Sequence, residues 1–218
     1  PKGHSVFTRE AALQAAHELG YPVLIRPSYV LGGQNMIIAF DDETVCRYMD
    51  IILDSGLTDN PILVDKYLMG QEVEVDAICD GEDVLIPGIM EHVERAGIHS
   101  GDSIAVYPPW NLSGPLIRQL CEISRTLALA LRTQGLLNIQ YVSYHNQVYI
   151  IEANPRASRT VPYMSKVTGL PIVELATRAM LGERIANMGY GVGLYREAPF
   201  KAVKAPVFSF EKLAGVDN

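Results

Sequence analysis

The segment that sets the architecture of this chain reads Val148-Tyr149-Ile150-Ile151-Glu152-Ala153-Asn154-Pro155-Arg156-Ala157-Ser158-Arg159. It begins as an apolar strand and ends with a carboxylate, a carboxamide and two guanidinium groups. Because alternate side chains of a strand share a face, Glu152, Asn154 and Arg156 are expected to point the same way. Two oxygen donors beside a fixed cation suit a magnesium ion that carries phosphates, whereas an unpaired charge in a packed core is costly. The segment therefore indicates a phosphoryl-transfer site.

A third oxygen donor lies on the strand that is expected to pair with this segment. Turn residues His145-Asn146 connect predicted strands at 136–144 and 148–154 into a hairpin. Pairing across such a hairpin brings Gln140 near Glu152. A carboxylate with amide oxygens suits Mg²⁺ completed by nucleotide phosphates, rather than a cage of protein ligands alone. The metal ligands predicted from this pattern are Gln140, Glu152 and Asn154.

Two arginines, Arg156 and Arg159, follow this patch. Guanidinium groups bind phosphate or carboxylate oxygens bidentately, so both residues are candidates for catalytic contacts with the transferred group. A different interpretation stays open, in which Gln140 and Glu152 form an ordinary cross-strand polar pair that faces solvent. The arginines favour the metal site over this alternative.

The overall composition is that of a globular protein. The chain has 218 residues, 48% hydrophobic and 20% charged, with a mean hydropathy of +0.10, which allows one large domain or two small ones. A net charge of −7 without a cluster of Lys or Arg argues against nucleic-acid or anionic-membrane partners. With no signal peptide and no apolar run of about 18 residues, a cytoplasmic location is predicted. Three cysteines without a CxxC pair predict reduced, packed thiols at Cys46, Cys79 and Cys121.

Hydrophobic periodicity divides the chain into three intervals. Residues 1–67 are predicted to form a small α/β unit, with helices at 8–19 and 42–55 and strands at 21–26, 36–40 and 61–67. Residues 68–182 are predicted to hold a central sheet, with strands at 72–79, 84–93, 136–144 and 148–154 and helices at 113–133, 160–168 and 171–181. The interval 183–218 adds a strand at 200–208. The residues at the two ends suggest a segment of a longer polypeptide.

Two features near the end of the first interval are candidates for phosphate contacts. The loop 29–35 contains Gly32 and Gly33, whose backbone amides can approach an anion, although an ordinary turn explains the pair equally well. Arg26 ends a strand just before this loop and can meet an α- or β-phosphate, or simply reach solvent.

The boundary between the first two intervals is a candidate for binding the nucleoside. An edge backbone at Asp65, Lys66 and Leu68 can present a donor and an acceptor to adenine, and Glu72 can accept ribose hydroxyls. A solvated linker explains these residues nearly as well. Beyond this boundary, acidic and apolar residues alternate from Glu72 to Ala77, which predicts a strand with one polar and one apolar face.

The segment 91–103 is unusually polar for the end of a strand. Its histidines, His92 and His99, lie seven residues apart, a spacing without metal-site meaning, and no nucleophile accompanies them. Nucleotide contact is therefore the preferred interpretation of this segment.

Three motifs occur in one order along the chain: Arg-Pro-Ser-Tyr-Val-Leu-Gly-Gly at 26–33, Glu-His-Val-Glu-Arg-Ala-Gly-Ile-His-Ser-Gly-Asp-Ser at 91–103, and Glu-Ala-Asn-Pro-Arg-Ala-Ser-Arg-Thr-Val-Pro at 152–162. From about Thr8 onward, the chain resembles the ATP-grasp domain of the carbamoyl phosphate synthetase large subunit. The resemblance implies an α/β (α+β) fold with a small α/β subdomain, a larger and mainly antiparallel subdomain with helices, and a nucleotide cleft between them. The wording of the first and third motifs resembles the C-terminal half, which phosphorylates carbamate, whereas the other half phosphorylates bicarbonate.

The resemblance also implies a role for each candidate residue. Arg26 matches the cation on the nucleotide phosphates, and the stretch from Asp65 through Lys66 to Leu68 matches the adenine hinge. Glu72 matches the acid on the ribose. The nucleotide-contacting loop matches Gly97, Ile98, His99 and Ser100. The ligands of two Mg²⁺ or Mn²⁺ ions match Gln140, Glu152 and Asn154, and Arg156 matches the residue that steadies the transferred phosphoryl group.

The implied reaction is attack of a carbamate oxygen on the γ-phosphorus of ATP, with metals and arginines stabilising the charge and the glycine loop excluding water. The implied partners are carbamate and carbamoyl phosphate, the remaining domains of the large subunit and a glutaminase small subunit. Gln34 stands where arginine is expected, and an upstream nucleotide-binding arginine is missing, so the isolated segment is expected to be incompetent alone. Two alternatives remain: another ATP-grasp carboxylate ligase or carboxylase, and a non-catalytic nucleotide-binding regulatory module.

Overall fold

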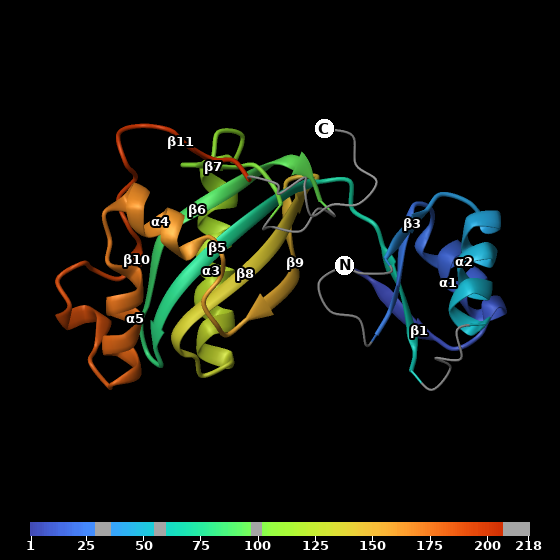
Figure 1. The fold of residues 1–218 in the computed structure, drawn as a ribbon, viewed down its shortest axis with the longest axis horizontal. Helices are drawn as coiled ribbons and strands as arrows, with labels where there is room; N and C mark the ends of the chain where they lie inside the picture. Colours follow the sequence, from blue (N-terminus) through green and yellow to red (C-terminus); the bar gives the residue numbers. More distant parts are fainter. Residues whose placement is uncertain (29–35, 55–59, 97–101, 207–218) are drawn as a thin grey trace, which may run out of the picture. The chain divides into compact units, whose positions relative to one another are not determined.

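The chain divides into two compact units, Pro1–Met69 and Gly70–Asn218. The computed structural model describes residues 1–28, 36–54, 60–96 and 102–206 (Figure 1). Each unit has its own sheet and its own buried core. The sequence predicted three intervals, 1–67, 68–182 and 183–218.

The first unit is an antiparallel sheet with two helices packed side by side on it (Figure 1). In its described residues, the strand order is β1-β4-β2-β3. The side chains of Ile25, Met49 and Val64 are completely buried in its core. The elements are β1 (Gly3–Val6), α1 (Arg9–Leu19), β2 (Val23–Pro27), β3 (Ile37–Ala39), α2 (Asp42–Asp54) and β4 (Ile62–Lys66).

Local capping explains where the two helices of this unit begin. The Thr8 hydroxyl accepts a hydrogen bond from the backbone N–H of Ala11 at 3.2 Å, before α1. The Asp41 carboxylate accepts one from the backbone N–H of Thr44 at 2.8 Å, before α2. Both contacts satisfy amides of a first helical turn that have no partner within the helix. Short side-chain signals of this kind are readable from the sequence.

The second unit is a larger sheet with helices on both faces (Figure 1). In its described residues, the strand order is β11-β7-β6-β5-β8-β9, and β10 pairs in parallel with β6. The other pairs in this sheet are antiparallel. The elements are β5 (Gln71–Asp80), β6 (Val84–Arg95), β7 (Ala105–Tyr107), α3 (Gly114–Ala130), β8 (Gln134–Tyr144), β9 (Gln147–Asn154), α4 (Val161–Thr168), α5 (Ile172–Met180), η1 (Ile185–Asn187), β10 (Gly193–Leu194) and β11 (Ala202–Lys204).

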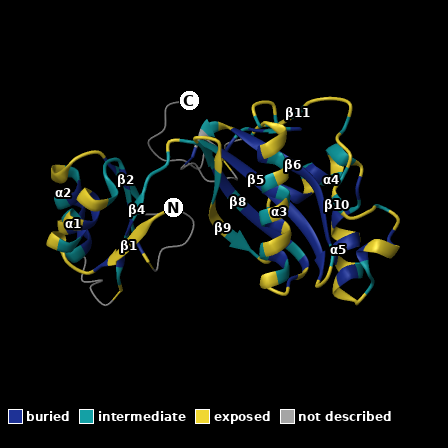
Figure 2. Ribbon diagram, turned by 180° about the vertical axis from the view of Figure 1, so that it is seen from behind, coloured by how far each residue is buried: buried dark blue, intermediate teal, exposed yellow. Residues whose placement is uncertain are grey.

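The central strand β5 is buried on both faces, as Figure 2 shows for the middle of this sheet. Val73 and Val75 pack in the core cluster that includes residues of α3. Ile78 packs in the cluster that includes residues of α4 and α5. The acids that alternate with the valines are also buried, with Glu74 0% and Asp76 2% exposed. The polar face predicted for this strand therefore exists, but it lies inside the unit.

Residues 183–206, the described part of the third predicted interval, belong to the second unit. The short strand β10 lies beside β6, and β11 lies beside β7. Within the described part of the strand predicted at 200–208, β11 (Ala202–Lys204) forms a strand, whereas residues 200–201 and 205–206 do not. All three cysteines are free thiols. Among the helices that the structure describes, none has the length and apolar character needed to cross a bilayer.

Candidate metal and nucleotide site

The predicted oxygen donors lie together on the paired strands β8 and β9. Gln140 stands directly opposite Glu152, and Asn138 stands opposite Asn154. Directly opposed residues of an antiparallel pair share a face, so these four side chains lie on the same side of the sheet. The Asn154 amide donates a hydrogen bond to Oε1 of Glu152 at 2.9 Å, and this contact is exposed. The geometry thus groups one carboxylate and two carboxamides at the surface of the second unit.

A β-bulge lies directly beside this row. Tyr141 pairs with Ile150 and Gln140 pairs with Glu152, so Ile151 is an extra residue without an opposite partner in the register. A bulge changes the phase of the side chains along one strand. Because of it, Ile150 shares a face with Tyr141, and Glu152 shares a face with Gln140.

The donor set fits a hard divalent cation. It contains carboxylate and amide oxygens without thiolate or imidazole, which is the chemistry that Mg²⁺ and Mn²⁺ prefer. Within the described part of the chain, no group of three or more His, Cys, Asp or Glu side chains is arranged to hold a metal ion. Three donors are fewer than the octahedral set that Mg²⁺ takes, so an ion at Gln140, Glu152 and Asn154 would have room for further ligands such as phosphate oxygens.

Two carboxylates lie buried on the same face as this row. On β5, Glu74 is opposite Gln140 and Asp76 is opposite Asn138. The Asn138 amide donates to Oε1 of Glu74 at 2.7 Å and to Oδ1 of Asp76 at 2.9 Å. The exposed row of oxygen donors thus continues inward as a hydrogen-bonded polar network.

The pKa values of the two buried acids are shifted in opposite directions. Burial, together with the charge of Glu74, raises the pKa of Asp76 to about 6. Burial also acts to raise the pKa of Glu74, but hydrogen bonds from His92 and Asn138 outweigh it and hold that pKa below its ordinary value. At neutral pH both acids are therefore mostly ionised, and Asp76 is the one that takes up a proton on mild acidification.

His92 lies between the network and the predicted ribose acid. Its Nε2 atom is 3.3 Å from Oε2 of Glu74, and its Nδ1 atom is 3.8 Å from Oε1 of Glu72. Both His92 and Glu72 are buried. The ring therefore lies beside two acids of β5, Glu72 and Glu74.

The predicted catalytic arginines lie on the segment between β9 and α4, and both are exposed. The Arg156 backbone N–H donates to the carbonyl of Asn154 at 2.8 Å, which turns the chain directly after β9. Its guanidinium donates to the adjacent carbonyl of Ala157 at 3.0 Å. Arg156 therefore lies in the turn that directly follows the row of oxygen donors, and its side chain is exposed.

The candidates in the first unit contact each other and the backbone. Nε of Arg26 lies 3.3 Å from Oδ2 of Asp65, so the predicted phosphate cation is paired with a residue of the predicted adenine hinge. The Lys66 ammonium donates to the carbonyls of Gly20 and Tyr21 at 2.8 and 3.0 Å. The half-buried Leu68 follows β4.

Six predicted nucleotide contacts lie outside the described residues. They are Gly32, Gly33, Gly97, Ile98, His99 and Ser100. Their assigned roles remain predictions.

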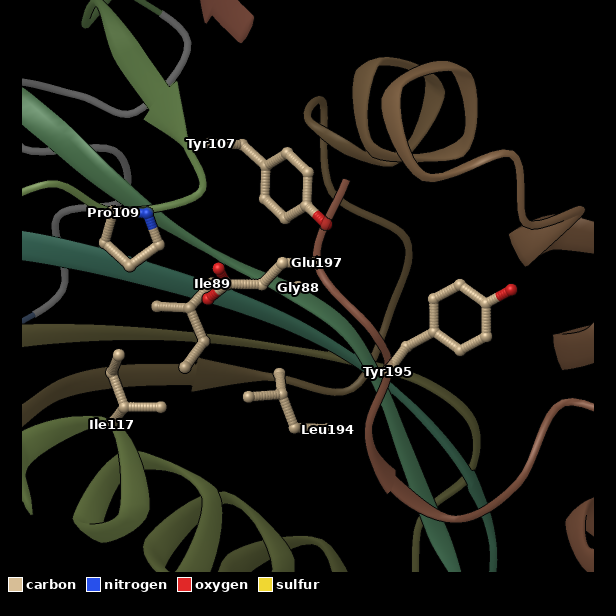
Figure 3. Close-up of a pocket in the computed structure, with 8 residues that line it drawn as sticks. All are labelled: Gly88, Ile89, Tyr107, Pro109, Ile117, Leu194, Tyr195 and Glu197. Atoms are coloured by element: carbon tan, nitrogen blue, oxygen red, sulfur yellow. The ribbon is translucent and has the colours of Figure 1, made fainter. Parts of the chain in front are cut away.

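A separate hollow lies in the second unit, where β10 runs beside β6 (Figure 3). The labelled side chains around it are mostly apolar, with Glu197 as the charged one. The residues that line it are Gly88, Ile89, Tyr107, Pro109, Ile117, Leu194, Tyr195 and Glu197. None of the predicted metal or nucleotide residues is among them, so this hollow carries no part of the candidate site.

Sequence reasoning missed the buried polar network, although the signal for it was present. Asn138 lies two residues before Gln140 on the same strand, and the period-two rule places both on one face. In the same way, Glu72, Glu74 and Asp76 are each two residues apart, so they share one face of their strand. The network also includes hydrogen bonds from the Ser158 and Thr160 hydroxyls to Asp76. These residues are more than 80 positions apart in the sequence, so no local pattern could show the contacts.

A family model for the "Carbamoyl-phosphate synthase L chain, ATP binding domain" matches residues 2–188. The chain belongs to this family. Relatives of this synthase-family chain named carbamoyl phosphate synthase large chain share 60% identity in Lachnoclostridium phytofermentans and 53% in Clostridium perfringens, each over 217 residues and 100% of this chain. The synthase-family chain spans 20% of the length of each of these relatives. Family membership, expected from the three motifs, is confirmed.

Solved biotin carboxylases resemble the synthase-family chain in fold. The biotin carboxylase–β,γ-ATP complex from Campylobacter jejuni has a TM-score of 0.73 at 22% identity, covering 84% of this chain and 43% of that one. The biotin carboxylase domain of the Hydrogenobacter thermophilus 2-oxoglutarate carboxylase, solved with MgADP, ADP and bicarbonate, has a TM-score of 0.71 at 21% identity, covering 84% and 42%. At such identities the likeness is one of fold, and the predicted ATP-grasp fold is confirmed.

Proposed function

We propose that this chain is the ATP-binding part of a carbamoyl phosphate synthase large chain and transfers the γ-phosphoryl group of ATP to carbamate. The observation that carries the proposal is the row on β8 and β9, where Gln140 opposes Glu152 and Asn154 is hydrogen-bonded to Glu152. Membership in the synthase family supports the class of enzyme. The motifs at 26–33 and 152–162 favour the C-terminal half, which acts on carbamate.

Gln140, Glu152 and Asn154 are proposed to hold Mg²⁺ or Mn²⁺, two ions per site, with the remaining ligands supplied by ATP. When bound, such ions offset the negative charge of the β- and γ-phosphates. The chain's own contribution is to present three oxygen donors on one face of a paired, rigid hairpin. We propose that these donors position the γ-phosphate end of ATP.

The proposed transfer requires no nucleophile from the protein. A carbamate oxygen forms a bond to the γ-phosphorus while the bond from that phosphorus to the β–γ bridging oxygen breaks, and ADP leaves with the electron pair. Negative charge spreads over the three equatorial oxygens during this step. Arg156 and Arg159, both exposed after β9, are proposed to stabilise that charge with their guanidinium groups.

The remaining candidates are proposed to hold the nucleotide. Arg26 is assigned to the phosphates, Glu72 to the ribose, and the stretch from Asp65 to Leu68 to adenine. The glycines Gly32 and Gly33 and the loop from Gly97 to Ser100 complete this assignment. The proposed partners are the other domains of the large chain and a glutaminase small subunit, in the cytoplasm.

The test is the partial back-reaction of the full-length large chain that carries this segment. The wild-type enzyme is expected to form ATP from MgADP and carbamoyl phosphate. Glu152→Gln keeps the shape of the side chain but removes its charge, and it is expected to lower this rate at least about 100-fold, a typical cost of losing one group that stabilises transition-state charge. Bicarbonate-dependent ATP hydrolysis, assigned to the other half, should persist in the variant.

A matched control lies on the same strand. The hydroxyl of the half-buried Tyr149 donates to Oε1 of Gln147 at 2.8 Å, so Tyr149→Phe removes a hydrogen bond of β9 without touching the oxygen row. It should retain the wild-type rate within about twofold, as expected for a surface substitution. A Glu152→Gln enzyme with unchanged ATP formation would rule out the metal assignment. Loss of bicarbonate-dependent hydrolysis alone would place the segment in the other half.

A further inference from the structure

The segment that carries Arg156 and Arg159 is tied to the buried acid Asp76. Oδ2 of Asp76 accepts a hydrogen bond from the Ser158 hydroxyl at 2.9 Å and another from the Thr160 hydroxyl at 2.7 Å. These two residues flank Arg159 on either side. The contacts span more than 80 residues of sequence, so they fasten this segment to the middle of the sheet.

The second acid of β5 reinforces this attachment. Thr160 Oγ1 also lies 3.1 Å from Oε1 of Glu74, and the Ser158 and Thr160 hydroxyl oxygens are 2.7 Å apart. The backbone N–H of Thr160 donates to Oγ of Ser158 at 3.1 Å. The Asn138 amide donates a hydrogen bond to each of the two carboxylates. The anchor is therefore a closed network rather than a single contact.

Thr160 forgoes its usual role in order to join this network. It is the N-cap residue of α4, a position where a threonine hydroxyl normally accepts a hydrogen bond from the first helical turn. Here it makes no such cap, and the side chain, 1% exposed, points to the carboxylates instead. The Thr160 hydroxyl therefore stabilises a contact with β5 instead of the first turn of α4.

Two buried carboxylates side by side are costly for stability alone. Each must be removed from water, and their charges repel, whereas apolar side chains of the same size would pack without that penalty. The raised pKa of Asp76, caused by burial and by the charge of Glu74, reflects the same cost. Departures from stable packing of this kind are expected at functional sites.

We propose that Asp76 is a positioning residue for the proposed phosphoryl transfer, because its carboxylate, through Ser158 and Thr160, fixes the backbone on which Arg156 and Arg159 stand. The acid does not touch the reacting atoms. It determines where the two guanidinium groups start, and thus how well they meet the charge of the transferred group. This inference rests on the function proposed above.

The test uses full-length large chain and the formation of ATP from MgADP and carbamoyl phosphate. Asp76→Asn is expected to lower kcat roughly 10- to 100-fold, the cost of a slightly misplaced catalytic group, with the KM for MgADP changed by less than about twofold. Thr160→Val, which keeps the volume but removes the hydroxyl, should behave in the same way. Asp76→Glu, which restores a carboxylate, should recover part of the rate.

A double-mutant cycle separates positioning from general damage to the fold. If Asp76 acts through Arg159, then Asp76→Asn has little further effect in an Arg159→Ala enzyme. Hydrogen exchange supplies a readout that does not require activity: amides of residues 156–160 should exchange faster in Asp76→Asn. The proposal would be overturned if the two substitutions lowered kcat independently, so that the loss in the double variant is the product of the two single losses. Unchanged exchange of the amides at 156–160 would also overturn it.

Asp80→Asn is the matched control, since Asp80 is a buried carboxylate on the same strand and bonds η1 and the β5–β6 turn instead. It should lower thermal stability while kcat and KM stay within about twofold of wild type at a temperature where it is folded. The proposed function is tested by the wild-type enzyme itself. A wild-type enzyme that forms no ATP from carbamoyl phosphate contradicts that function, whereas an active wild type with an equally active Asp76→Asn contradicts only the positioning role.

Discussion

Asp76 and Asp80 lie four residues apart on β5, and both are buried. Their pKa values are nevertheless shifted in opposite directions. Asp76 faces hydroxyls, a carboxamide and the charge of Glu74, and burial raises its pKa to about 6. At Asp80, burial also acts to raise the pKa, but backbone N–H groups of Asp83, Ile185 and Glu82 outweigh it and lower the pKa to about 2. Two aspartates on the same strand thus differ in pKa, because Asp76 lies beside a second carboxylate whereas Asp80 accepts hydrogen bonds from several backbone N–H groups.

The difference in partners indicates that Asp80 stabilises the fold, whereas Asp76 is the residue proposed to position the segment between β9 and α4. Asp80 accepts the amides of Glu82 and Asp83 at 2.9 and 2.7 Å and that of Ile185 at 2.7 Å, which closes a turn and docks η1. Arg184 adds a charged contact to Asp80 at 3.0 Å. These partners stabilise the ionised carboxylate, and nothing in this set belongs to the candidate site.

The largest effect on stability is expected from Asp80→Asn. Because its pKa is lowered, Asp80 contributes stability above its ordinary pKa of 3.8 and loses that contribution as pH falls through about 2. At pH 7 the variant should therefore lose about 2–3 kcal/mol of unfolding free energy. Urea unfolding followed by the fluorescence of Trp110, the single tryptophan, which lies in the second unit, measures it.

The pH profile provides the check on this first prediction. The gap between wild type and Asp80→Asn should narrow as pH falls from about 4 toward 2. Glu82→Gln is the control, because Glu82 also contacts Arg184 but its side chain is 73% exposed. A gap that stays constant with pH would show that the carboxylate charge of Asp80 contributes little.

Asp76 should show the opposite dependence on pH, with a slightly smaller effect. Because its pKa is raised, its contribution to stability is full below its ordinary pKa of 3.8 and is lost as pH rises through about 6. Relative to Asp76→Asn, the wild-type chain should therefore gain about 2 kcal/mol between pH 7 and pH 4.5. The same Trp110 fluorescence measures the difference between the two profiles, and parallel profiles would contradict the raised pKa.

The smallest effect is expected from Arg184→Met. The Arg184 side chain is 37% exposed, so solvent screens its contacts with Asp80, Glu82 and Asp83. The variant should lose less than about 1 kcal/mol of unfolding free energy. A loss as large as that of Asp80→Asn would mean that the arginine, rather than the backbone amides, holds Asp80 ionised.

Much of the fold could be predicted from the sequence because its signals are local. The alternation in β5, the turn at His145-Asn146 and the glycine stops of helices each act within a few residues, and these elements lie where they were expected. The strands that were missed, β1, β7 and β10, have two to four residues. Such short strands are defined by partners far away in the sequence, so periodicity cannot reveal them.

The candidate site divides in the same way. Gln140, Glu152 and Asn154 could be grouped from the sequence because a hairpin is a local structure with a fixed pairing rule. The burial of Asp76 could not be predicted, since it depends on the segment between β9 and α4 folding back over β5. An alternating strand shows which residues share a face, but it does not show what covers that face.

The bulge at Ile151 makes the hairpin tolerant of one specific change in length. The turn at His145-Asn146 sets the pairing as far as Tyr141 with Ile150, and beyond the bulge the pairing resumes with Gln140 opposite Glu152. Deletion of Ile151 would leave both sets of partners opposed, whereas deletion of a residue nearer the turn would force one set out of phase. Among related chains, a difference of one residue in the length of this hairpin is therefore expected at this position, where a residue can be lost while the pairing on both sides is kept.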